Sequence, residues 1–238
     1  MIIDWKAHIL PGLDRKCDSH VKAIQLMIYA KRAGIDKLVA MPFYEPGTDL
    51  RQFIEMRDEA FASVHGGVVA EDMPELVLGT EFKYDKQILD TDGVELLKET
   101  PVLLVDFGGK LPSDEELKAL HDYFGDRLMV SDADALSDED KLRLTRLGFQ
   151  SVVDLSEIHH SKDIKKLLPF VESGFVRGFG GDKLAGRDPY RHLEKTKRRM
   201  GEGFEKLCKK LCVHGVHPLS YNPIIRQTTP QGNSCDVE

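Results

Sequence analysis

The strongest constraint on the fold of this chain is a repeated change of hydrophobic pattern. Short apolar runs, typical of buried strands, alternate with stretches whose apolar residues recur every three or four positions, as on one face of a helix. Seven runs predict strands, at residues 2–8, 36–41, 76–81, 101–106, 127–130, 151–155 and 175–179. This alternation favours a parallel sheet covered by helices, either closed as a barrel or left open and doubly wound.

Capping residues and apolar faces mark the helices between these strands. We expect helices over about residues 18–33, 161–172 and 189–211, and further helices starting at Thr48-Asp49 and at capping boxes opened by Ser113 and Ser137. The apolar side chains expected to face inward include Phe53, Met56, Ala60, Val64, Leu142 and Leu147.

The size of the chain suits one large domain. It has 238 residues, of which 41% are hydrophobic and 31% charged, so it can bury a core without disulfides or metals. We expect a single domain over residues 1–217. Residues 218–238 are rich in Pro, Asn, Gln and Thr and lack periodicity, which predicts a tail packed loosely or not at all.

Charge and cysteine usage narrow the class of protein. Lys and Arg number 33 against 40 Asp and Glu, a net charge of -7 that argues against a general binder of nucleic acid or anionic membranes. No apolar run is long enough to span a bilayer, and residues 1–6 lack the pattern of a secretory signal. Four scattered cysteines favour a reducing cytoplasm.

Two of these cysteines lie near two histidines, in the spacing Cys208, Cys212, His214, His217. The spacing is too tight for a usual zinc finger. Cys208 and Cys212 fall four apart at the end of a predicted helix, where small buried residues are common. We therefore favour a structural role for this cluster over a metal site.

Polar side chains gather at the predicted strand ends. In both α/β architectures, ligands bind at the carboxyl ends of the strands. The residues at or just beyond these ends are Lys6, His8, Phe43, Tyr44, Glu81, Asp106, Ser131, Asp132, Asp154 and Asp182. The enrichment in carboxylates predicts a site, although acidic residues at these positions also cap the helices that follow.

One segment is specific enough to indicate a family. The run Ile-Asp-Trp-Lys-Ala-His-Ile-Leu-Pro-Gly-Leu-Asp, residues 3–14, resembles the opening of the bacterial PHP-type metal-dependent protein tyrosine phosphatases of the capsule-biosynthesis group. That opening reads His-x-His-x-x-Pro-Gly-x-Asp-Asp-Gly. The resemblance continues through residues 34–42, 79–81 and 180–184. It implies a distorted (β/α)7 barrel with a cluster of divalent metals, such as manganese, iron or zinc, at the strand ends.

Carried over position by position, the resemblance implies a depleted ligand set. Four metal ligands, which would also form the residual catalytic site, look retained: His8, Asp14, Glu81 and Asp182. Four look replaced, by Lys6, Phe43, Leu184, and Ser131 or Asp132. Phenyl and isobutyl groups offer no lone pair, and a protonated lysine repels a cation. The implied metal content is therefore reduced, or zero if the set is fully degenerate.

A basic residue in place of a ligand suggests a specific hypothesis. The ammonium of Lys6 would replace a missing metal electrostatically, among Asp14, Glu81 and Asp182. Lys6, Lys183 and Arg187 are also the candidate binding residues for an anionic substrate. The basic run at residues 195–199 is either a second anion patch or an ordinary solvated helix face.

Three functions remain open at this stage. The first is a phosphatase relative that has lost most or all hydrolytic power and binds or regulates a phosphotyrosine-bearing protein or a kinase. The second is an active phosphoesterase with one metal on His8, Glu81 and Asp182, near Asp14 and with help from His159. The third is a purely structural protein. The sequence does not indicate an oligomeric state.

Overall fold

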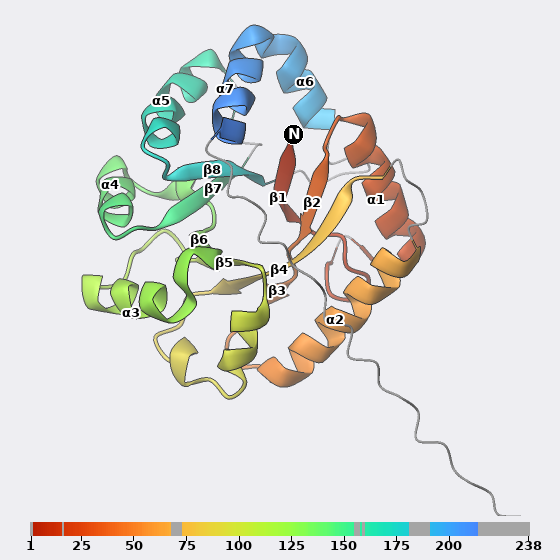
Figure 1. The fold of residues 1–238 in the computed structure, drawn as a ribbon, viewed down its shortest axis with the longest axis vertical. Helices are drawn as coiled ribbons and strands as arrows, with labels where there is room; N and C mark the ends of the chain where they lie inside the picture. The colour runs from red at the N-terminus through yellow and green to blue at the C-terminus, as the bar shows by residue number, and fades with distance from the viewer. Residues whose placement is uncertain are drawn as a thin grey trace, which may run out of the picture.

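The chain forms an α/β barrel with its helices outside (Figure 1). The computed structural model describes residues 2–15, 17–67, 73–154, 158, 160–180 and 191–213. Its strands are β1 (Ile3–Ala7), β2 (Lys37–Ala40), β3 (Phe43–Tyr44), β4 (Glu75–Lys83), β5 (Val102–Asp106), β6 (Leu128–Val130), β7 (Gln150–Asp154) and β8 (Val176–Gly180). Each of the seven predicted strand positions therefore holds a strand.

The sheet is parallel and closed. Its order is β2-β1-β8-β7-β6-β5-β4-β3, and β2 also pairs with β4, which joins the two ends. β3 continues β2 in an unchanged register on β4, because Lys37 pairs with Glu75 and Phe43 with Glu81. Within the described residues, β2 and β3 therefore occupy one strand position together, and the barrel has seven strand positions. The closure confirms the (β/α)7 barrel and excludes the open sheet.

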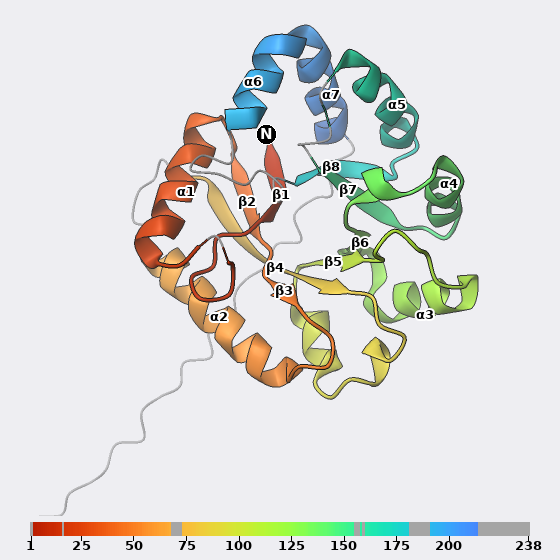
Figure 2. The ribbon, with the colours of Figure 1, turned by 180° about the vertical axis from the view of Figure 1, so that it is seen from behind.

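The helices follow the strands around the outside of the barrel (Figure 2). They are α1 (His20–Arg32), α2 (Leu50–Gly67), α3 (Asp114–Phe124), α4 (Asp138–Arg146), α5 (Ser161–Glu172), α6 (Arg191–Met200) and α7 (Glu202–Val213). Short 3-10 turns lie at η1 (Ile88–Asp90), η2 (Val94–Glu99), η3 (Gly125–Arg127) and η4 (Ala133–Ala135). The caps at Ser113 and Ser137 form as predicted, accepting from the amides of Glu116 and Asp140.

Three details differ from the sequence prediction. The helix expected over residues 189–211 is divided at Gly201, whose left-handed φ of 47° ends α6 before α7 begins. Met56 is 46% exposed and Leu142 is 54% exposed, so neither is a core residue. In α2 the inward position belongs to Arg57, which is 4% exposed. Its guanidinium donates to the hydroxyls of Thr80 and Thr100, a pairing that hydrophobic periodicity alone does not reveal.

Two apolar cores support the barrel. A small core of Val39, Met41, Leu104, Met129 and Val152, with Trp5 against it, fills the barrel interior. A larger core lies between the outer surface of the sheet and the helices. The interior core ends below the carboxyl ends of the strands, and the polar strand-end residues lie above it.

Several sequence predictions fall on residues outside the described ranges. These are Asp182, Lys183, Leu184, Arg187, His159, His214, His217 and the segment 218–238. The side chains of Cys208 and Cys212 are likewise not described. Among the helices that are described, none combines the length and apolar character needed to cross a membrane.

Candidate ligand site at the barrel mouth

A β-bulge in β1 turns Lys6 into the barrel. Asp4 pairs with Leu38 and Ala7 with Ala40, so two residues, Trp5 and Lys6, lie opposite a single residue of β2. The extra residue breaks the alternation of faces, and both side chains point inward. The amide of Lys6 donates to Oδ1 of the buried Asp4 carboxylate at 3.0 Å, which holds the bulge in place.

Two glycines of β8 make room for these inward side chains. A Cβ atom on Gly178 would lie 2.1 Å from the indole ring of Trp5. A Cβ on Gly180 would lie 2.6 Å from Cβ of Lys6. Neither position accepts a side chain unless Trp5, Lys6 or the strands themselves shift, so the Gly-rich β8 strand is matched to the bulged β1 strand.

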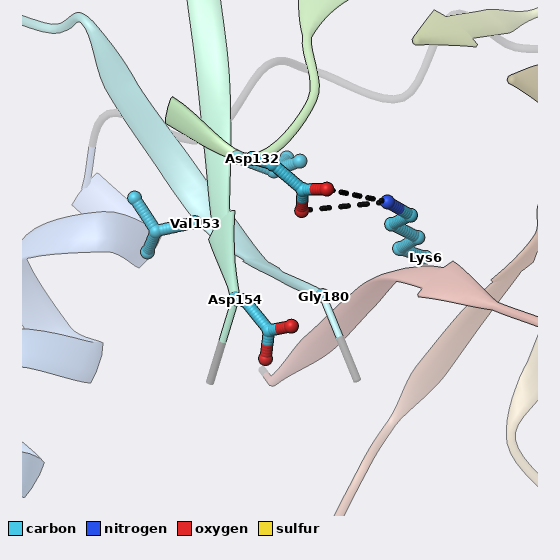
Figure 3. Close-up of a pocket in the computed structure, with 6 residues that line it drawn as sticks. Lys6, Asp132, Val153, Asp154 and Gly180 are labelled. Carbon is cyan, nitrogen blue, oxygen red and sulfur yellow. Dashed lines mark hydrogen bonds and ion pairs between the residues drawn. The ribbon is translucent and has the colours of Figure 1, made fainter. Parts of the chain in front are cut away.

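The ammonium of Lys6 lies in a ring of oxygen atoms. Its Nζ is 2.9 Å from Oε1 of Glu81 and 2.9 Å from Oγ of Ser131. The carboxylate of Asp132 lies 3.3 and 3.4 Å from the same nitrogen (Figure 3). The Ser131 hydroxyl in turn donates to Glu81 Oε1 at 2.6 Å. The side chains of Lys6 and Glu81 are only 4% and 3% exposed, so this is a buried ion pair with hydrogen bonds.

Opposing influences act on the pKa of the Glu81 carboxyl. Burial raises this pKa above its ordinary value, because it removes water from the charged form. The charge of Lys6 and the hydrogen bond from Ser131 act in the opposite direction. The carboxylate thus depends on Lys6 for the stability of its charged form.

The backbone just after β6 is shaped to present Asp132 to Lys6. Asp132 has a left-handed conformation, with φ 49° and ψ 42°, and is the non-glycine residue with positive φ in the described part of the chain. Asp tolerates this region better than most residues, at a cost that glycine would not have. The turn carries the chain from β6 into η4 while the carboxylate faces back to the ammonium.

His8 and Asp14 form a second pair at the same mouth. Nδ1 of His8 is 2.8 Å from Oδ1 of Asp14. The other carboxylate oxygen of Asp14 accepts the amide of Leu10 at 2.7 Å, which fixes the carboxylate. A histidine whose Nδ1 is held by a carboxylate has a defined ring orientation, as is common for catalytic and metal-binding histidines.

A small recess lies beside Lys6. It is lined by Lys6, Asp132, Val152, Val153, Asp154 and Gly180, and contains about 150 Å³ of space not filled by atoms, part of it open to solvent. Asp154 follows Val152 on the inward side of β7, whereas Val153 belongs to the outer core (Figure 3). The walls therefore combine one cation with the carboxylates of Asp132 and Asp154.

Phe43 brings an aromatic ring to the rim of this mouth. It pairs in register with Glu81 on β4 and is 38% exposed. Phe43 thus lies on the strand next to that of Glu81, at the strand end where the sequence predicted it. A phenyl group there can offer an apolar contact to a ligand but no metal bond.

The predicted site residues are only partly brought together. Lys6 contacts Glu81, as the replacement hypothesis requires, but Asp14 pairs with His8 rather than with Lys6. Ser131 and Asp132 complete the ring around Lys6, a role that sequence reasoning missed. The position of these two residues directly after β6 was the sequence feature that could have indicated this role. Asp182, Lys183 and Arg187 lie outside the described residues.

The described residues do not fit the metal cluster that the sequence resemblance implies. In the described ranges, no three His, Cys, Asp or Glu side chains are grouped so that they could hold a metal. Independently of this, the Lys6 ammonium already contacts the Glu81 carboxylate, at a distance that leaves no room for a cation between them. A lysine ammonium offers only donors to that position.

Comparisons with known proteins agree with this fold. The family model for capsular polysaccharide synthesis proteins, CpsB/CapC, matches residues 2–122, a span that contains Lys6, His8, Asp14 and Glu81. A chain from the crystal structures of YwqE from Bacillus subtilis and CpsB from Streptococcus pneumoniae, described as unique metal-dependent tyrosine phosphatases, is 17% identical. The match covers 90% of this chain and 96% of that chain, with a TM-score of 0.63.

A second solved structure matches this chain more distantly. A Thermotoga maritima phospho-2-dehydro-3-deoxyheptonate aldolase matches with 11% identity and a TM-score of 0.44, over 87% of this chain and 69% of that chain. No curated protein matches the sequence.

Proposed function

Because this chain belongs to the CpsB/CapC family of capsular polysaccharide synthesis proteins, we propose that it is a variant of that scaffold whose metal site has been replaced by Lys6. It acts as a binding or regulatory protein, with weak hydrolytic activity or none. The observation that carries this proposal is the contact of Lys6 Nζ with Glu81, Ser131 and Asp132.

The electrostatics of that contact support the replacement. Carboxylates packed at a barrel mouth repel each other unless a cation lies between them. The structural relatives are described as metal-dependent tyrosine phosphatases, and the sequence resemblance implies a metal cluster at this mouth. Here a buried ammonium supplies one positive charge to Glu81 and Asp132 and hydrogen-bonds to both.

The partner class follows from the family. The structural match is to proteins described as tyrosine phosphatases, which supports a phosphotyrosine-bearing protein as the partner of this chain. We propose that this partner is a protein such as a kinase and that the two meet in the cytoplasm. Lys183 and Arg187 are the candidate residues for its phosphate, because Lys6 is buried on its own carboxylates.

Metal content and turnover test the proposal together. The purified protein is expected to contain manganese, iron and zinc far below one equivalent, and to hydrolyse an aryl phosphate no faster with added manganese than without it. Lys6→His serves as the matched variant, and we expect it to gain no stoichiometric metal, because Phe43 still lacks a donor. Stoichiometric metal in the wild-type protein would contradict the replacement.

A second candidate function is an active phosphoesterase with a reduced metal site. The pairing of His8 with Asp14 favours it, because an oriented imidazole is what a metal ligand or general base requires. In that case His8, Glu81 and Asp182 would hold the ion, and metal-dependent turnover would be lost in Glu81→Gln. Turnover that survives both chelation and Glu81→Gln would point to a contaminating phosphatase.

A further inference from the structure

The charge of the protein is unevenly divided along the chain. Residues 1–150 contain 18 Lys and Arg against 29 Asp and Glu, whereas residues 151–213 contain 14 against 9. The excess of bases thus belongs to the part of the chain that forms β7, β8 and the helices α5, α6 and α7. An acidic protein therefore carries a basic C-terminal third.

The fold gathers this positive charge on one side of the barrel. α7 packs against both α5 and α6, and the three helices lie side by side in both views (Figures 1 and 2). Six of their exposed bases form what we call the basic face: Lys162, Lys165 and Lys166 of α5, Lys195 and Arg198 of α6, and Lys206 of α7. Lys210 of α7 is also exposed, but it pairs with Glu172 of α5 and is not counted. The face lies on the outside of the helices, away from the barrel interior.

Most bases of this face have no carboxylate beside them. Some bases in the first part of the chain do pair with carboxylates, among them Arg51, Arg57, Lys86, Lys141 and Arg143. On the basic face, Lys206 lies 4.0 Å from Glu202. Among the described residues, no acidic side chain lies within ion-pair distance of the other five bases.

This arrangement costs stability rather than adding to it. Lys162 and Lys166 are four residues apart on α5, and Lys195 and Arg198 are three apart on α6. Like charges at these spacings repel each other on a helix surface. By contrast Lys197, on the same helix, has a structural role, because its ammonium donates to the carbonyl of Ala33 at the end of α1. Among the described residues, the one ion pair of the basic face is that of Lys206 with Glu202.

We propose that the basic face is a docking surface for a short acidic segment of a partner protein. The chemistry of the basic face favours such a segment over an anionic membrane or a nucleic acid. The large apolar side chains described as exposed are Val21, Phe43, Met56 and Leu142, all outside α5–α7, so the described side chains of these helices include none that would enter a bilayer.

A long nucleic acid is disfavoured as well. The net charge of -7 repels an extended polyanion, whereas a short segment experiences mainly the local positive field within a Debye length. Phe204 is buried and Phe170 is packed against the core, so no aromatic ring of the described parts of α5–α7 is free to stack on bases. This docking surface is proposed whether or not the barrel mouth binds a metal.

Charge reversal on the full-length protein tests the proposal. The probe is a fluorescein-labelled dodecapeptide of Glu and Ser, with a Lys and Ser peptide of equal length as its negative control. The test variant is Lys166→Glu/Lys195→Glu/Arg198→Glu. The matched control is Lys83→Glu/Lys110→Glu/Lys118→Glu, which changes the net charge equally at exposed positions outside the face.

We expect salt-sensitive binding of the acidic peptide to the wild-type and control proteins, and affinity lower by about tenfold or more in the test variant. Far-UV circular dichroism and unchanged thermal midpoints establish that both variants are folded. The proposal is overturned if the acidic peptide does not bind, or if both variants lose affinity equally. It is also overturned if wild-type self-association disappears in the test variant, since the face would then belong to a second copy of the chain.

Discussion

At the scale of single residues, the site depends on the balance between Lys6 and Glu81. Burying either charge alone is costly, whereas the pair is held together by its own attraction and by Ser131. The strand-end rule located all three residues from sequence. It could not assign their partners, because it ignores backbone donors. The amide of Leu10 fixes Asp14 beside His8 and so removes Asp14 from the ring around Lys6.

Removing the lysine should make stability depend on pH. In Lys6→Met the pKa of Glu81, already raised by burial, rises further because the lowering effect of Lys6 is lost. A carboxyl whose pKa is higher in the folded state gives stability below its unfolded pKa and loses it as pH rises through its folded pKa. Urea unfolding should show a loss of about 3–5 kcal/mol at pH 8 and a smaller loss at pH 5.

The double variant is the control for this experiment. Lys6→Met/Glu81→Gln removes both charges, so it should recover much of the lost stability, and its stability should no longer depend on the titration of residue 81. Equal losses at both pH values in the single variant would mean that packing of the lysine stem, rather than its charge, stabilises the site.

The turn at Asp132 permits a separate test. A left-handed alanine costs about 1 kcal/mol more than glycine in the same conformation. Although both substitutions remove the carboxylate, Asp132→Ala should therefore be less stable than Asp132→Gly by about that amount in urea unfolding. The opposite order would show that the turn does not keep its left-handed backbone, with φ 49°, in solution.

At the scale of elements, the sequence was informative where periodicity is simple. Runs of apolar residues indicated each of the seven strand positions, and Ser113 and Ser137 indicated the starts of α3 and α4. The bulge in β1 could not be foreseen, because one extra residue in a short strand leaves no trace in hydrophobicity. Its consequence, an inward Lys6 next to an inward Trp5, required the pairing register. The break at Gly201 was hidden for the opposite reason, since helical spacing continues across it.

The contact between β1 and β8 gives a prediction at this scale. Gly180→Ala places a Cβ 2.6 Å from Cβ of Lys6, so the strands must separate or Lys6 must leave its ring. We expect a loss of about 1–3 kcal/mol in the free energy of unfolding. Gly66→Ala is the matched control, because nothing lies within 4 Å of its Cβ in α2, and it should be neutral or slightly stabilising.

At the scale of the whole molecule, the closed sheet explains why distant residues meet. β2 pairs with both β1 and β4, so a single strand position separates residue 6 on β1 from residue 81 on β4, and the turn after β6 supplies residues 131 and 132 from across the mouth. Alternation of strands and helices predicted this architecture. The choice between a barrel and an open sheet depends on whether the end strands pair with each other. The periodicity of the sequence carries no information about that pairing.

The expected domain boundary can be tested on the intact fold. If the domain ends near residue 217, a chain truncated there should unfold within about 2 °C of the full-length protein, since surface changes rarely exceed half a kcal/mol. Differential scanning calorimetry of both chains measures this directly. A drop of several degrees would show that residues 218–238 belong to the cooperative unit.

The tether of Lys6 to β1 has a consequence for the environment in which this protein works. A bound ion leaves when a chelator or a scarce supply lowers its concentration in the medium. An ammonium joined to the backbone by covalent bonds cannot be depleted in this way. The charge balance of Glu81 should therefore be indifferent to metal starvation and excess alike, and set instead by acidity.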